Sequence, residues 1–115
     1  MKIQPINHQV SVSDQLTAAD LKELKALGVS VIVCNRPDAE APDQADFAEI
    51  AQAAAALAIK AVHLPFTGNQ MTQAQIDTFA ALLKDHQRLH AYCRTGNRSS
   101  QMAAASERQL QAQRP

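Results

Sequence analysis

A run of β-branched residues at positions 29–34 (VSVIVC) constrains the fold of this chain more than any other feature. Such a run, bounded by turn residues, is typical of a strand that is buried on both faces of a sheet. Residues 60–64 and 88–92 are predicted as strands of the same kind, and residues 3–12 as one or two short strands. These strands alternate with helical patterns, and that alternation predicts an α/β fold with a small, mostly parallel sheet and helices on both faces.

Four helices are predicted from apolar periodicity, at about residues 17–27, 43–57, 72–85 and 99–111. Thr17 with Asp20, and Thr72 with Gln75, have the spacing of a capping box at a helix start. Gly28 is expected to end the first helix. The expected order is β-α-β-α-β-α-β-α within a single domain spanning residues 1–115, a common length for one domain.

Composition argues against nucleic acid and membranes as partners. The formal net charge is zero, and the chain has three Phe, one Tyr and no Trp, too few for a base-stacking platform. The longest apolar run, residues 53–59, is too short to span a bilayer, and the first residues lack the apolar core of a signal peptide. We therefore expect a soluble cytoplasmic protein whose two cysteines are free thiols.

Three segments follow the predicted buried strands at their carboxyl ends: residues 34–36, 63–67 and 93–100. Ligands of open α/β sheets bind at that edge. The segment 93–100 (CRTGNRSS) carries the most chemistry, because a cysteine stands where a strand turns into a helix. Backbone N–H groups, the helix dipole and two arginines favour a thiolate there, and such cysteines have a pKa of about 3.5–7.5.

Cys93 and Arg98 are therefore the predicted catalytic residues. Gly96 is expected to permit a backbone angle closed to other residues. Ser99 or Ser100 is expected to cap the last helix and to donate a hydroxyl to the thiolate. The residues expected to bind the substrate are Arg94, Thr95, Gly96, Asn97, Ser99 and Ser100.

Three residues at the same edge each have two interpretations. Cys34 is either a second thiol that exchanges with Cys93 or a small core side chain. Arg36 either binds an anion or is an exposed loop charge, and His63 either lines the pocket or is a hydrogen-bonded structural residue. His86 and His90 lack a third ligand, so neither a metal nor another cofactor is expected.

The chain resembles two families. Residues 92–100 look like the active-site loop of rhodanese-type sulfurtransferases. The body around that loop, including residues 28–32, 36–38 and 62–65, resembles the phosphatase-like domain of beta-lactamase-hydrolase-like proteins over almost the whole chain. That resemblance implies a dual-specificity-phosphatase-like fold, in a family whose members occur alone or fused to sulfide-oxidising enzymes.

Two features favour sulfur transfer over phosphate chemistry. Four residues separate Cys93 from Arg98, as in rhodanese loops, whereas tyrosine phosphatases carry five. Residues 65–71, where a phosphatase would hold its general acid, contain no carboxylate. We therefore expect a sulfurtransferase that takes sulfane sulfur from thiosulfate or a persulfide and passes it to a thiol such as glutathione.

Two alternatives stay open. One is a cysteine-dependent phosphatase, with Cys93 as nucleophile and Arg98 as phosphate clamp. The other is a non-catalytic module that binds an anion or sulfane sulfur for a sulfide-oxidising partner, fused or separate.

Overall fold

The computed structural model describes residues 1–114 and contains one five-stranded sheet with the strand order β1-β2-β5-β3-β4. Only the pair β1 and β2 is antiparallel, and the other neighbouring strands run parallel. The elements are β1 (Gln4–Pro5), β2 (Val10–Ser13), α1 (Asp20–Ala26), β3 (Val31–Cys34), α2 (Phe47–Ala55), β4 (Lys60–His63), α3 (Gln73–Asp85), β5 (Leu89–Tyr92) and α4 (Asn97–Ala112). The predicted α/β class is confirmed, and four helices lie in the four expected regions of the chain.

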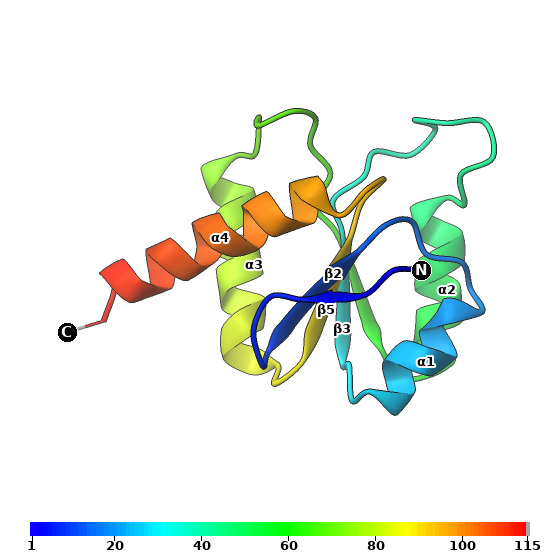
Figure 1. Cartoon of the computed structure of the whole chain (residues 1–115), viewed down its shortest axis with the longest axis horizontal. Coiled ribbons are helices and arrows are strands. Elements are labelled where there is room, and N and C mark those ends of the chain that lie inside the picture. Colours follow the sequence, from blue (N-terminus) through cyan, green and yellow to red (C-terminus); the bar gives the residue numbers. More distant parts are fainter. Residues whose placement is uncertain (115) are drawn as a thin grey trace.

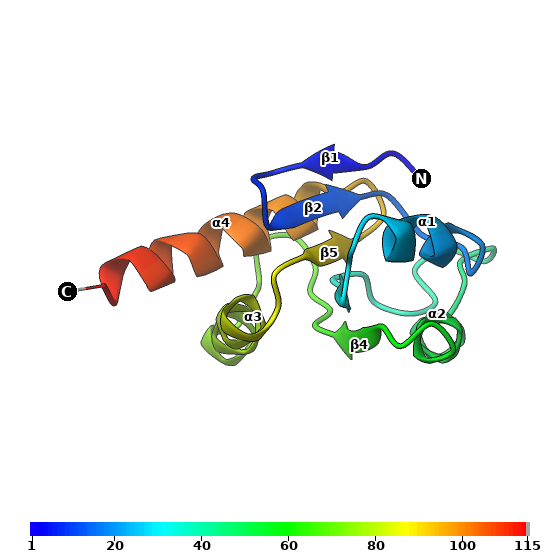
Figure 2. The ribbon, with the colours of Figure 1, turned by 90° about the horizontal axis from the view of Figure 1, so that it is seen from below.

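Helices cover both faces of the sheet, with α3 and α4 on one face and α1 and α2 on the other (Figures 1 and 2). Two separate cores fill the layers. Val31 and Val33 pack with Phe79 and Met102 on the first face, while Ile32 and Cys34 pack towards α1 and α2 on the second. The unbroken β-branched run of β3 is explained by this burial on both sides, since successive side chains point to opposite faces.

The starts of α1, α2 and α4 differ from the sequence prediction. Helix α1 begins at Asp20 with Ala19 as its cap, and the Thr17 side chain makes no cap bond. Only half of the expected box forms, since the Thr17 N–H donates to Asp20 Oδ2 at 2.8 Å. The capping box of α3 forms completely, with Thr72 and Gln75 in their expected roles.

Helix α2 begins at Phe47 and not at residue 43. Gln44 explains the delay, because its side chain holds the preceding loop: its Oε1 accepts the Glu40 N–H at 3.1 Å and its Nε2 donates to the Pro37 carbonyl at 2.9 Å. Asp38 then accepts the Phe47 N–H at 2.8 Å through Oδ1. The loop between β3 and α2 is thus fixed in place by side chains from its own residues.

Within the part of the chain that the structure describes, no helix has the length and apolar character needed to cross a membrane.

Candidate active site

The three segments predicted to meet at the carboxyl edge of the sheet do meet there. Asn35, immediately after β3, joins them: its Nδ2 donates to the Leu64 carbonyl at 3.0 Å, and its Oδ1 accepts the Ser99 hydroxyl at 2.9 Å. Arg98 reaches the Phe66 carbonyl at 3.0 Å. Asn35 is fully buried. Sequence reasoning did not single it out, because an Asn after a strand is also an ordinary turn residue.

Cys93 lies directly after β5 in a cradle of backbone N–H groups, and it has no exposed surface. Its Sγ accepts the Gly96 N–H at 3.1 Å. The backbone N–H groups of Ser99, Thr95 and Arg98 also stabilise its charged form. Burial alone would raise the pKa of Cys93, but these four donors outweigh it and hold the pKa below its usual value. The cradle therefore stabilises a thiolate.

Gly96 lets the chain turn inside the cradle. Its φ is +95°, in the left-handed region, and it is the N-cap of α4. A Cβ at this position would lie 3.4 Å from the Ser13 carbonyl oxygen, which also accepts the Cys93 N–H at 3.3 Å. Both the angle and the close approach of β2 favour glycine.

The expected roles of the two serines are wrong. Helix α4 begins at Asn97 with Gly96 as cap and no side-chain cap bond, so neither Ser99 nor Ser100 caps it. The Ser99 hydroxyl donates to Asn35, and only its backbone N–H is directed at the thiolate. Asn97 N–H is held by the Thr95 hydroxyl at 3.3 Å, while Arg94, Thr95 and Asn97 face solvent.

Arg98 is bound by a carboxylate that the sequence did not reveal. Its Nη2 lies 2.8 Å from Glu40 Oε1 and its Nη1 lies 2.8 Å from Oε2, a two-pronged contact. Glu40 sits in the loop before α2, in a segment without periodicity or motif. The folded loop brings Glu40 into contact with Arg98, which lies 58 positions later in the chain.

Arg36 binds the same carboxylate. Its Nε lies 3.0 Å from Glu40 Oε1, and its Nη1 donates to Gln15 Oε1 at 2.9 Å. Arg36 is only 4% exposed, so its interpretation as an exposed loop charge is wrong. The pKa of Glu40 falls to about 2, chiefly through the Arg98 hydrogen bond, with Arg36 adding to it. Glu40 is therefore ionised at neutral pH.

Acid is expected to remove the stability that Glu40 provides. The folded-state pKa of about 2 lies below the ordinary value of 4.5, so this contribution is complete above pH 4.5 and disappears as pH falls towards 2. Denaturant unfolding of wild type and Glu40→Gln should show that the wild type has the higher free energy of unfolding at neutral pH. The difference should be on the order of 1 kcal/mol, after allowance for solvent screening. That difference should shrink through the stated window, and a difference independent of pH would contradict the assignment.

His63 and Cys34 lie beside this cluster. The ring of His63 stacks on Phe47 with centroids 4.5 Å apart, and its Nε2 donates to the Arg36 carbonyl at 2.9 Å. Cys34 is buried and donates to the same carbonyl at 3.3 Å. Burial raises the pKa of Cys34, whereas the cradle lowers that of Cys93, so the two thiols differ in reactivity. Whether Cys34 exchanges with Cys93 stays a prediction.

Cys34→Ser is expected to leave the chemistry at Cys93 within about twofold of wild type, because a neutral thiol is a poor nucleophile. The serine hydroxyl can keep the bond to the Arg36 carbonyl. The test is the steady-state rate of the reaction that depends on Cys93, measured for the purified variant and for wild type. A large loss of turnover in a folded variant would instead support the sulfur relay.

His86 and His90 form hydrogen bonds with serines of the sheet and its adjoining turns. His90 is fully buried between Ser11 and Ser13, whose hydroxyls lie 2.7 Å and 2.8 Å from its ring nitrogens, and burial lowers its pKa to about 4. His86 Nδ1 bonds to the Ser30 hydroxyl at 2.7 Å. Across residues 1–114, no three His, Cys, Asp or Glu residues gather as a possible metal site.

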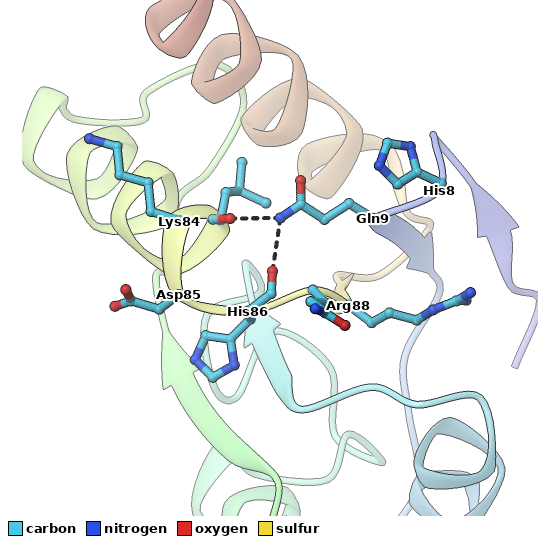
Figure 3. Close-up of a pocket in the computed structure, with 8 residues that line it drawn as sticks. His8, Gln9, Lys84, Asp85, His86 and Arg88 are labelled. Carbon is cyan, nitrogen blue, oxygen red and sulfur yellow. Dashed lines mark hydrogen bonds between the residues drawn. The ribbon is translucent and has the colours of Figure 1, made fainter.

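A separate open pocket lies at the amino-terminal end of β5, away from Cys93 (Figure 3). Gln9 is one of the residues that line the pocket. Its Nε2 donates to the carbonyls of Leu83 at 2.6 Å and His86 at 2.8 Å. These bonds occupy carbonyls at the end of α3. The pocket is built around a helix end and its lining contains no cysteine, so the cysteine chemistry considered below does not take place there.

The sheet, its crossovers and the cysteine cradle define a cysteine-dependent, phosphatase-like enzyme fold. Residues 2–110 match the family described as beta-lactamase hydrolase-like protein, phosphatase-like domain. Because the match spans nearly the whole chain, the protein belongs to this family.

Individual relatives agree with that assignment. A beta-lactamase hydrolase-like protein of Agrobacterium fabrum (strain C58) is 30% identical over 100 residues, which are 86% of this chain and 23% of that protein. The chain thus spans about a quarter of that relative's length. A solved structure from Neisseria meningitidis, described as a candidate phosphatase, is 33% identical, with a TM-score of 0.81, over 100% of this chain and 81% of that one.

The fold also occurs in a more distant solved structure. TpbA of P. aeruginosa, solved in complex with pTyr, has a TM-score of 0.67 and 18% identity over 97% of this chain and 65% of that one. At this identity the likeness concerns the fold. The expectation of a dual-specificity-phosphatase-like fold is therefore confirmed, and none of these three relatives is described as a sulfurtransferase.

Proposed function

We propose that the protein is a sulfurtransferase that carries sulfane sulfur on Cys93. The observation that carries this proposal is the small cradle: only four residues separate Cys93 from Arg98, and the backbone N–H groups of Thr95, Gly96, Arg98 and Ser99 stabilise the cysteine sulfur as a thiolate. A ring of this size suits one added sulfur atom better than a phosphoryl group with three equatorial oxygens.

The reaction balances with residues at the site. The Cys93 thiolate attacks the outer sulfur of thiosulfate, an S–S bond forms, and the S–S bond of thiosulfate breaks with its electron pair leaving on sulfite. The persulfide anion remains in the cradle. A thiolate such as that of glutathione then attacks the outer sulfur, takes it as a persulfide and regenerates the Cys93 thiolate. Exposed Arg94 attracts and orients the anionic donor.

No step of this reaction needs a general acid, because sulfite leaves as a stable anion. The surroundings of Cys93 are consistent with a reaction that needs no acid. Residues 65–71 contain no carboxylate, and Asp77 lies in α3, exposed and bonded to Gln73 and Gln109. Glu40 is near the site, but with a pKa of about 2 it has no proton to give at neutral pH.

A cysteine-dependent phosphatase is the second candidate, and the family and the structural neighbours favour it. Arg98 has the planar fork that holds a phosphate group, once Glu40 releases it. An aryl phosphate, whose leaving group needs little protonation, is the substrate most compatible with a site lacking an acid.

Parallel turnover assays separate the candidates. The purified protein is given thiosulfate with glutathione in one assay and an aryl phosphate in another, and sulfite and phosphate release are followed. We expect sulfite release to exceed phosphate release by a large factor. Phosphate release without sulfite would overturn the proposal in favour of the phosphatase, and release of neither would favour a non-catalytic binding module.

The physiological setting is proposed on the same basis. A reducing cytoplasm would keep Cys93 as a thiol and supply glutathione as acceptor. A sulfide-oxidising enzyme, fused or separate, is the partner that would use or provide the transferred sulfur.

A further inference from the structure

Glu40 occupies Arg98 in the way that an anionic substrate would. Its two carboxylate oxygens face the two terminal nitrogens of the guanidinium, both at 2.8 Å. A planar fork of this kind binds carboxylate, sulfate and phosphate groups with the same geometry. The Arg98 guanidinium also lies close enough to Cys93 that the thiolate adds to the rise in its pKa, after the larger effect of Glu40. The carboxylate therefore holds the cation beside the nucleophile.

Glu40 has a second anchor that does not depend on Arg98. The buried Arg36 binds Oε1 at 3.0 Å and is itself held by Gln15. The surrounding loop is fixed by Gln44 and Asp38. Glu40 can therefore release Arg98 and still have a cationic partner, which lowers the cost of the exchange because no carboxylate is left unpaired.

The ion pair is open to solvent, but the nucleophile is not. Cys93 has no exposed surface, whereas the side chain of Glu40 is 24% exposed and that of Arg98 14% exposed. An anion arriving from solvent can therefore contact the Arg98–Glu40 pair, whereas Cys93 offers it no surface.

We propose that Glu40 is an internal competitor for the anion site: it occupies Arg98 in the resting protein, and an incoming dianion displaces it from Arg98 and leaves it bound to Arg36 alone. The exchange favours ligands with two negative charges, because a singly charged carboxylate gains nothing over the one already in place. This inference rests on Arg98 being part of the substrate site, but not on the reaction performed there.

Sulfate is the probe, because it has the shape and charge of thiosulfate and carries no sulfane sulfur or ester to react. Its dissociation constant is measured at pH 7.5 and low ionic strength for wild type, Glu40→Gln and Asp43→Asn. Asp43 is exposed in the same loop, so Asp43→Asn removes the same charge without touching Arg98. We expect sulfate to bind about tenfold more tightly to Glu40→Gln, equivalent to about 1.4 kcal/mol, and within about twofold of wild type to Asp43→Asn.

Equal or weaker sulfate binding by Glu40→Gln would overturn the proposal, as would equal tightening by both variants. If Glu40→Gln does not fold, Glu40→Asp replaces it. The shorter side chain cannot span both arginines, so intermediate tightening is expected and unchanged affinity would overturn the proposal. Failure of the proposed reaction is distinguishable, since it would leave sulfate binding and its dependence on Glu40 intact while no sulfite is formed from thiosulfate.

Discussion

Cys93→Ser is expected to lower kcat/KM for thiosulfate by at least about 10⁴-fold, because removal of a covalent nucleophile commonly costs that much or more. A serine hydroxyl in this cradle stays protonated at neutral pH, and it cannot form a persulfide. The substitution changes one atom in a site that Gly96, Ser99 and Arg98 build mostly from their backbone. We therefore expect the variant to fold with nearly wild-type stability, measured by denaturant unfolding.

The matched control is Cys34→Ser, which makes the same change at the end of the neighbouring strand β3. It should retain turnover while Cys93→Ser loses it. Cys93→Ser should also still bind sulfate, because Arg98 and the N–H groups remain. Residual thiosulfate turnover by Cys93→Ser above the level of the uncatalysed reaction would show that another group carries the sulfur.

Gly96→Ala is expected to weaken both the fold and the reaction. Alanine at a φ of +95° costs on the order of 1–3 kcal/mol, and its Cβ meets the Ser13 carbonyl oxygen at 3.4 Å. Any relief of that contact shifts the Gly96 N–H away from the Cys93 sulfur. A displacement of about 1 Å in a catalytic group can cost about 10²-fold in rate, so we expect a loss of about tenfold to a hundredfold in kcat, measured on folded protein.

Gly28→Ala is the control that tests whether backbone strain at a positive φ lowers turnover by itself. Gly28 also has a positive φ, +87°, but it follows α1, and a Cβ there meets only the flexible side chain of Arg88 at 3.6 Å. Stability should fall while turnover per folded molecule stays near wild type. If both glycine variants lost turnover equally, the effect of Gly96→Ala would be general destabilisation and not a change in the cradle.

Much of the fold follows from local sequence patterns. The β-branched run of β3 predicts a strand covered on both sides, and the parallel alternation places Cys34, His63 and Cys93 at one edge. The cradle itself is also local, since Cys93 and the four N–H donors lie within seven consecutive residues. Glycine, arginine and a strand-to-helix turn are therefore enough to predict from the sequence a cradle that favours a thiolate at Cys93.

The long-range partners of that loop have no comparable signal. Glu40 and Asn35 reach Arg98 and Ser99 from a different loop, and their positions depend on how the chain after β3 folds back. The predicted capping role of Ser99 and Ser100 is wrong for a related reason. Gly96 in the left-handed region starts α4 two residues earlier than expected, which turns the Ser99 side chain towards Asn35.

The mass of Cys93 after exposure to thiosulfate tests the central claim most directly. The protein is incubated with thiosulfate alone, freed of small molecules and analysed by peptide mass. Sulfur transfer predicts one added sulfur atom on the Cys93 peptide, none on the Cys34 peptide, and complete loss of that sulfur on addition of glutathione. An unmodified Cys93 peptide from folded protein that hydrolyses an aryl phosphate would contradict the account.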